Sequence, residues 1–161
     1  MLKRYCTRFF AIIALAIGSG LAHATIHIPD AFLPATVTGA VDLDTDTIKC
    51  GLMDVSSYAR ATDVFRSDIT EVTGTGYTAG GQNVTSITVS NDTTNHKTVI
   101  TITPAVWSGA TTISATGAYC YKSTGTAAAD RLIVISDFGG TVSSSGGTYT
   151  VNAIVIEFTH F

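Results

Sequence analysis

Apolar residues along most of this chain alternate with polar ones or form short β-branched blocks, and both patterns are typical of strands. A single short helix is predicted over residues 61–68, with Val64 and Phe65 turned inward. The 27 threonines favour a pleated surface over helices. We therefore expect an all-β fold, either an antiparallel β-sandwich or a partly open barrel, with one short helix. The predicted strands cover residues 47–53, 84–89, 97–103, 111–122, 131–136 and 148–158.

Turn-forming residues separate these predicted strands. Glycines are dense in residues 74–81, and polar residues fill 91–95. A hairpin-like connection is predicted from Gly139-Gly140 to the serine- and glycine-rich stretch 143–147, and Gly117 is a candidate β-bulge. No linker divides the region after the N-terminal segment, so residues 25–161 are expected to form a single domain.

The first 24 residues have a different composition. Three cations and no acid precede an apolar run over residues 9–17, and Ala22-His23-Ala24 follows. This order is the pattern of a secretory signal peptide, and the run is shorter than the roughly 20 apolar residues of a membrane-spanning helix. Two interpretations stay open: a signal that contacts a membrane transiently before cleavage after Ala24, or a retained hydrophobic arm buried in an assembly partner.

Charged residues make up only 13% of the chain, against roughly 25% in ordinary soluble domains, and the mean hydropathy is +0.34. This composition excludes a disordered chain. The formal net charge of −3 disfavours nucleic acid as a partner, because phosphate binding requires a basic surface. A charge-poor surface instead suits repeated protein contacts, whose centres are depleted in Lys and Glu.

Three cysteines are present, at Cys6, Cys50 and Cys120. Removal of the first 24 residues would leave an even pair, and a Cys50–Cys120 disulfide would contribute roughly 3–4 kcal/mol by closing a long loop. The alternative is two buried free thiols that behave as small hydrophobic residues. Neither cysteine belongs to a CxxC pair, so the sequence predicts no metal or redox site.

Candidate catalytic or ligand-binding patterns are weak. Asp42, Asp44 and Asp46 would share one face of a strand, but the glycine and glutamate that a calcium loop requires are absent. The glycines of residues 74–81 match neither nucleotide-binding fingerprint, and the chain has no G-x-S-x-G nucleophile elbow. We therefore predict no catalytic, cofactor-binding or metal-binding residues, no enzyme activity and no small-molecule substrate.

Four aromatic residues are candidates for exposed contact anchors: Trp107, Tyr77, Tyr119 and Tyr121. Trp107 is more often a core residue. If these side chains were exposed, they could also stack on sugars, which makes a carbohydrate-binding module a third and minor hypothesis for this chain.

Several segments resemble small virion structural proteins of tailed bacteriophages, and the resemblance extends over about residues 42–156. The matching segments are Asp44-Thr45-Asp46-Thr47-Ile48-Lys49, residues 71–82 around Gly76-Tyr77-Thr78-Ala79-Gly80-Gly81, Val106-Trp107, residues 118–127 and Asp137-Phe138-Gly139. The resemblance implies a non-enzymatic particle component, either a capsid decoration or minor capsid protein or a tail-associated one. It also implies self-association, other virion proteins as partners and a location in the virion.

The N-terminal segment departs from that resemblance and keeps a second hypothesis open. An export-like leader together with a possible disulfide is typical of secreted bacterial proteins. The alternative is therefore an exported surface protein or a pilin- or adhesin-like filament subunit, secreted or located at the cell surface.

Overall fold

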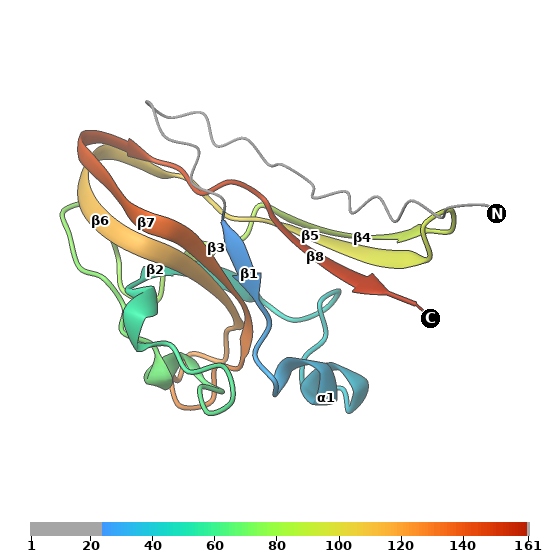
Figure 1. The fold of residues 1–161 in the computed structure, drawn as a ribbon. Coiled ribbons are helices and arrows are strands. Elements are labelled where there is room, and N and C mark those ends of the chain that lie inside the picture. The colour runs from blue at the N-terminus through green and yellow to red at the C-terminus, as the bar shows by residue number, and fades with distance from the viewer. Residues whose placement is uncertain (1–23, 161) are drawn as a thin grey trace.

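The computed structural model describes residues 24–160, so nearly all of the signal-like segment lies outside the described residues. The described chain forms two antiparallel sheets and one short α-helix (Figure 1). The larger sheet has the strand order β1-β7-β6-β2-β3, and the smaller has the order β4-β5-β8. Both sheets are open, which confirms the predicted all-β, sandwich-like fold class.

The boundaries of the elements are as follows. The strands are β1 Thr25–His27, β2 Ile48–Met53, β3 Gln82–Asn83, β4 Ser86–Asp92, β5 Lys97–Thr103, β6 Trp107–Lys122, β7 Leu132–Tyr149 and β8 Ile154–Thr159. The helix α1 spans Phe32–Val37, and two 3-10 turns lie at η1 Val55–Ser57 and η2 Arg66–Asp68.

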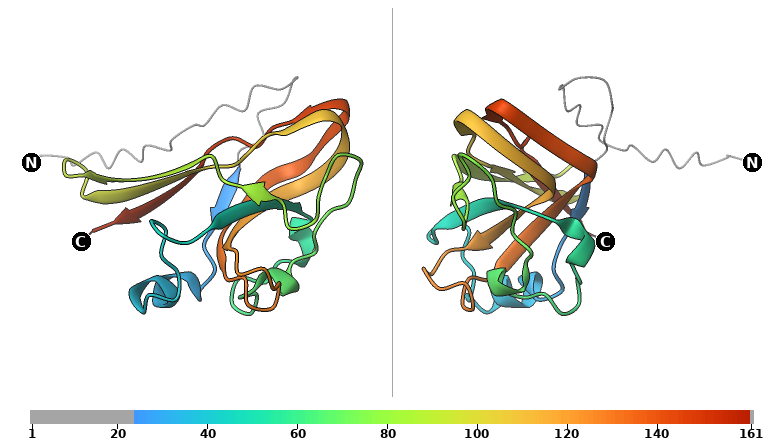
Figure 2. Two further views of the ribbon diagram at one scale, coloured as in Figure 1. Left: turned by 180° about the vertical axis from the view of Figure 1, so that it is seen from behind. Right: turned by 90° about the vertical axis from the view of Figure 1, so that its left-hand side faces the viewer.

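A long two-stranded ribbon connects the two sheets. β6 and β7 pair along most of their length, from Trp107 opposite Tyr149 to Tyr121 opposite Leu132. Short connections lead from β5 into β6 and from β7 into β8, so the same pair of chain segments continues from one sheet into the other (Figure 2). The register shifts between Ala115 and Gly117 and at three other points, and such bulges bend a ribbon. The irregularity falls next to Gly117, where a bulge was predicted, but its extra residues belong to β7, between Asp137 and Val142.

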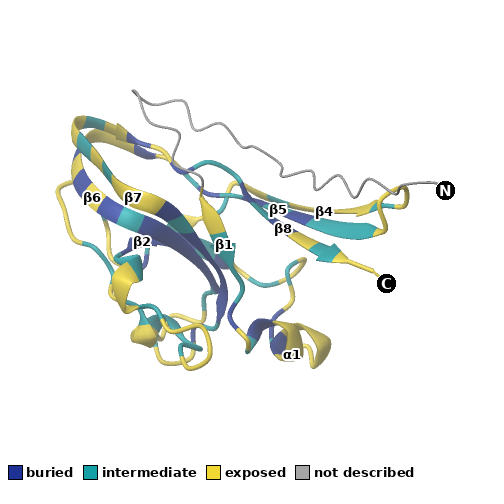
Figure 3. Ribbon diagram, viewed as in Figure 1, coloured by how far each residue is buried: buried dark blue, intermediate teal, exposed yellow. Residues whose placement is uncertain are grey.

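Strand β2, the second half of β6 and the start of β7 are buried on both faces of the five-stranded sheet (Figure 3). One face contributes Cys50, Cys120 and Val134 to a cluster with α1 and the inner face of the smaller sheet. The other contributes Tyr119 and Ile135 to a cluster under the segment that contains η1. Burial on both faces explains the nearly continuous apolar sequence at the start of β7. A third cluster lies inside the curved part of the β6–β7 ribbon and includes Leu52, Trp107, Ile113, Phe138 and Tyr149.

The predicted helix over residues 61–68 is wrong in its position. This segment contains turns and the 3-10 turn η2, because its backbone bonds to the β6–β7 connection: Arg66 N donates to Asp130 O and Leu132 N donates to Val64 O. The Asp68 carboxylate also accepts from the backbone N–H groups of Val64 and Phe65. These contacts replace the hydrogen bonds that would propagate an α-helix.

The short α-helix lies instead at α1. Phe32 and Ala35 are three positions apart on its buried face. Pro34 falls in the first turn, where a missing N–H does not interrupt the helix. Gly39 follows the helix with φ +73, a left-handed conformation that commonly ends helices.

The predicted connection through Gly139-Gly140 and 143–147 is also wrong, because these residues belong to β7. Residues Val142 to Ser144 pair with Ala115 to Ile113 of β6, and this pairing holds a glycine- and serine-rich segment extended. Conversely, the single strand predicted over 148–158 is interrupted between Tyr149 and Ile154, where the chain passes from one sheet to the other.

Candidate functional site

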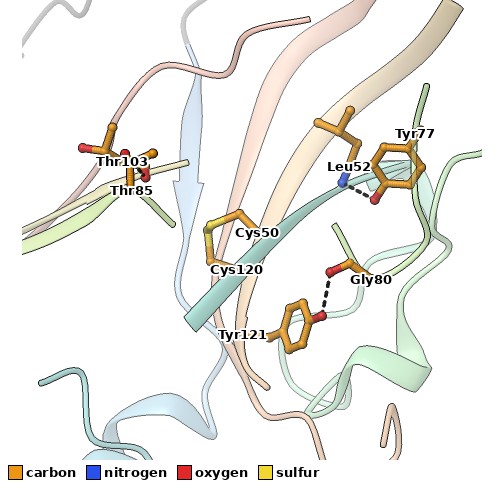
Figure 4. Close-up of a disulfide and its surroundings, with 8 residues drawn as sticks. All are labelled: Cys50, Leu52, Tyr77, Gly80, Thr85, Thr103, Cys120 and Tyr121. Atoms are coloured by element: carbon orange, nitrogen blue, oxygen red, sulfur yellow. Dashed lines mark hydrogen bonds between the residues drawn. A yellow bond between two sulfur atoms is a disulfide. The ribbon is translucent and has the colours of Figure 1, made fainter. Parts of the chain in front are cut away.

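Cys50 and Cys120 form a disulfide between β2 and β6 (Figure 4). The two residues lie directly opposite each other in the strand register, with Cα atoms 4.1 Å apart. The sequence alone was compatible with either a disulfide or two free thiols, and the structure contains the disulfide. Both residues are buried in the core cluster between the sheets, so the bond braces the fold and does not present a reactive sulfur to solvent.

Glu71 is the acceptor at the centre of a partly buried polar cluster. Its Oε1 atom accepts hydrogen bonds from Tyr77 Oη at 2.5 Å and from Gly80 N at 2.6 Å. Tyr77 Oη in turn accepts from Leu52 N of β2 at 2.9 Å (Figure 4). Burial, assisted by the hydrogen bond to Glu71, raises the pKa of Tyr77, so its hydroxyl stays protonated. These bonds fasten the glycine-rich loop to β2.

Arg66 and Asp130 form an ion pair beside this cluster. Arg66 Nε donates to Asp130 Oδ2 at 2.9 Å, and Arg66 Nη1 lies 3.7 Å from Glu71 Oε2. The Asp130 side chain is 1% exposed, and its Oδ1 atom accepts from Thr124 N and Thr124 Oγ1. Burial acts to raise the pKa of Asp130, but the hydrogen bonds from Thr124 and Arg66 outweigh it and lower that pKa. The ion pair therefore holds η2 against the β6–β7 connection.

Of the four aromatic residues expected as contact anchors, Trp107, Tyr119 and Tyr121 are buried and Tyr77 is half-buried. Tyr121 Oη donates to Gly80 O at 2.6 Å, and the Tyr119 ring stacks on the Tyr121 ring at a centroid distance of 5.7 Å (Figure 4 shows Tyr121 and Gly80). Trp107 is 1% exposed and lies between Tyr77 and Tyr149. These rings do not form an exposed platform for sugars, which removes the residue basis of the carbohydrate-binding hypothesis.

Close packing around Tyr119 requires a glycine on the neighbouring strand. A Cβ atom on Gly51 would lie 2.6 Å from Cζ of Tyr119, so Gly51 is the residue that admits this ring. The Tyr119 hydroxyl is buried and has no hydrogen-bond partner within the described residues. Burial raises the pKa of Tyr119, so this hydroxyl is neutral.

Asp42, Asp44 and Asp46 lie in turns and do not form the strand that their alternation suggested. Asp42 Oδ1 accepts from Asp44 N, while Asp46 Oδ2 accepts from Asp42 N and lies 2.9 Å from Lys122 Nζ. The turn and one lysine therefore use these carboxylates. Within residues 24–160, no group of three or more His, Cys, Asp or Glu side chains is arranged to hold a metal ion.

A shallow hollow of about 180 Å3 lies along the last third of β7. Serine, threonine and glycine make up most of its lining residues, and Tyr149 is the one titratable residue among them. Burial raises the pKa of Tyr149, so the hollow presents no ionised group. Its lining residues are Val142, Ser143, Ser144, Ser145, Gly147, Thr148, Tyr149 and Thr150.

The open sheet edges are the other candidate site. β1 and β3 end the larger sheet, and β4 and β8 end the smaller one. An edge strand presents unpaired N–H and C=O groups to which another strand can bond. Val89 on the edge strand β4 and Leu33 and Val37 on α1 are among the large apolar side chains that solvent reaches. These edges and exposed apolar side chains are surfaces at which another chain could bind.

Sequence reasoning missed Arg66, Glu71 and Asp130 as a cluster. The available signal was the rarity of charged residues in this chain and, for Glu71, its place just before the glycines and tyrosine of residues 74–81. None of the helices in the part of the chain that the structure describes is long and apolar enough to cross a membrane.

Comparison with protein-family models, with curated proteins and with solved structures finds no significant match.

Proposed function

We propose that this protein is a non-enzymatic structural component of a bacteriophage virion, a capsid decoration, minor capsid or tail-associated protein. It assembles with copies of itself and with other virion proteins through the faces and edges of its sheets. The observation that supports this proposal is that clustered charges of the chain lie inside the fold, whereas unpaired backbone groups lie at the sheet edges. The clustered charges of Arg66, Glu71 and Asp130 brace the fold, while unpaired backbone groups are presented at the sheet edges.

The resemblance of residues 42–156 to small phage virion proteins directs the proposal to a particle. Several of the resembling residues brace the interior: Tyr77 and Gly80 bond to Glu71, and Trp107 and Tyr119 are buried. The resemblance therefore includes residues that stabilise the fold. A disulfide-braced, charge-poor subunit suits an assembly that must hold repeated contacts without Lys or Glu at their centres.

An exported surface protein or filament subunit is the second candidate. The Cys50–Cys120 disulfide favours it, because such bonds form and persist in oxidising compartments outside the cytosol. Together with the signal-like first 24 residues, the disulfide would place residues 25–161 in the periplasm, in the medium or on the cell surface.

Mass spectrometry on the native source separates the two candidates. Particles are purified on a density gradient, and the same fractions of a particle-free culture are the control. The chain in particle fractions, at a stoichiometry of many copies, supports the virion assignment. Its absence from purified particles, together with a mature N-terminus at Thr25 in periplasm or medium, would contradict that assignment and favour export.

A further inference from the structure

The four sheet edges of the described chain differ in how well they are protected against pairing with another strand. β1 and β3 have three and two residues, which is too short for a stable added strand. β8 carries the partly exposed Glu157 within the strand, and charged side chains on an edge discourage pairing, whereas the one charged residue of β4, Asp92, is its last residue. β4 has seven residues, contains no proline or lysine, and pairs with β5 without a register shift. β4 is therefore the least protected edge.

The register identifies which backbone groups of β4 are free. His160 N donates to His96 O at 2.7 Å, and bonded and non-bonded pairs alternate along an antiparallel ladder. Ile100 and Ile102 of β5 consequently bond to β8, whereas Val99 and Thr101 bond to β4. Three residues of β4 then direct their N–H and C=O groups toward the open edge: Ile87, Val89 and Asn91.

The side chains of these residues continue an apolar face of the smaller sheet. Val89 lies opposite Ile100, which lies opposite Ile156, so the three form a row across the sheet. Ile100 and Ile156 are 7% and 1% exposed, but Val89 is 61% exposed. The row is therefore buried in the centre of the sheet and ends at a solvent-exposed valine on the edge.

We propose that β4 of one copy pairs antiparallel with β4 of a second copy, about a two-fold axis at Val89. This pairing would join two three-stranded sheets into one of six strands and place Val89 against its equivalent. It deepens, and rests on, the proposed assembly through sheet edges by naming the edge and the partner.

The β4 sequence is complementary to itself in this register. On either side of the Val89 pair, Thr88 opposes Ser90, Ile87 opposes Asn91 and Ser86 opposes Asp92, so no two like charges face each other. The single charged residue of the strand, Asp92, is already engaged, since its carboxylate accepts from Thr94 N, Asn95 N and Asn95 Nδ2. A two-fold interface must be self-complementary, and this edge meets that requirement.

Sedimentation of the full chain tests the pairing with two matched proline variants. V89P removes an N–H that faces the open edge of β4 and leaves the bonds to β5 in place. T159P does the same on the open edge of β8 and is the control. We expect the wild-type chain and T159P to form a concentration-dependent dimer, and V89P to weaken the dimer at least about tenfold.

Amide hydrogen exchange on the unaltered chain gives a second readout that depends on no substitution. Raising the protein concentration should slow exchange at Ile87, Val89 and Asn91 and leave Thr159 unchanged. A wild-type chain that stays monomeric at about 0.1 mM, or a V89P dimer as tight as the wild-type one, would overturn the pairing. A monomeric chain found in purified particles would overturn it while leaving the virion assignment intact. A dimer formed by a chain that is absent from purified particles would support the β4 pairing and contradict the virion assignment.

Discussion

The two sheets of this protein are held by different means. The five-stranded sheet contains the Cys50–Cys120 disulfide, and the partly buried Arg66–Asp130 ion pair lies beside it, with Arg66 over the ring of Tyr121 in β6. The described side-chain bonds of the three-stranded sheet include the partly exposed Lys97–Glu157 pair and a Thr98–His160 hydrogen bond at its far end. The larger sheet is braced by a disulfide and an ion pair between segments distant in sequence, whereas the smaller is held by its strand ladder and by the packing of its inner face in the core cluster.

This difference indicates which sheet opens more easily. Local opening is easiest where few apolar side chains are buried and backbone hydrogen bonds meet solvent. β4 has no fully buried residue, while β6 and β7 have continuous buried stretches. The smaller sheet is therefore expected to open first and to be the part available to a partner, with the braced sheet as its support.

The largest effect is expected from breaking the brace at Asp130. Replacing Asp130 with Ala leaves Arg66 partly buried without its partner and removes the acceptor for two Thr124 groups, which should cost about 3–5 kcal/mol. Urea unfolding followed by tryptophan fluorescence measures this loss. Asp30→Ala is the matched control, because its pair with Arg60 is mostly exposed and should change the free energy of unfolding by less than about 1 kcal/mol. Equal losses in the two variants would show that the buried pair does not brace the sheet.

Removing the disulfide by the double substitution of Cys50 and Cys120 with Ala should cost about 3–4 kcal/mol. The reason is that the bond closes a long loop, of sequence separation 70, in the unfolded chain. Differential scanning calorimetry of the variant and of the oxidised wild type measures the loss. An unchanged Tm would contradict the bracing role of the bond.

Substitutions on the inner face of the smaller sheet should lower the free energy of unfolding much more than substitutions on its edge strand. Ile102→Ala removes a fully buried side chain next to Ile154 and should cost about 2–4 kcal/mol. Val89→Thr, on the same sheet and the same face, changes a residue that is exposed in the monomer, and at protein concentrations too low for β4 pairing it should change the free energy of unfolding by less than about 0.5 kcal/mol. Urea unfolding of both variants provides the comparison. Similar costs at the two positions would mean that β4 is covered in solution.

The smallest effect concerns acid. The folded-state pKa of Asp130 is lowered, so its stabilising contribution is complete above the unfolded pKa of about 4 and is lost as the pH falls through the lower folded value. Wild-type stability should therefore fall more steeply between about pH 5 and pH 2 than that of Asp130→Asn. Parallel slopes in urea unfolding across this range would contradict the assignment. Burial raises the pKa of Tyr58 to about 12, so this tyrosine does not contribute to the acid limb.

The strands could be predicted because each alternates in sequence and pairs with a neighbour of the same kind. β2 and β5 lie within one residue of their predicted ranges. The errors have a common cause, which is pairing between segments far apart in sequence. Residues 64–68 bond to residues 130–132 and do not form a helix, and the glycine- and serine-rich half of β7 is extended because β6 lies beside it.

One part of the candidate site, the disulfide, could be predicted from the sequence, and the other part, the Glu71 cluster, could not. A pair of cysteines is visible in a sequence, and the directly opposed positions on β2 and β6 supply the geometry that the pair needs. The Glu71 cluster depends on a tyrosine hydroxyl and a backbone N–H of the glycine-rich loop and on an arginine of η2. Side-chain periodicity contains no information about such a meeting point, because the loop conformation alone creates it.

The disulfide also determines how this subunit would respond to tension along its chain. The segment between Cys50 and Cys120 cannot be drawn out while the bond is intact, which withholds about 240 Å of contour length at roughly 3.4 Å per residue. β4 and β5 lie within that closed loop, whereas β8 lies outside it. A pull on the C-terminal end would therefore strip β8 away first, while the hairpin of β4 and β5 stays tethered to the braced body.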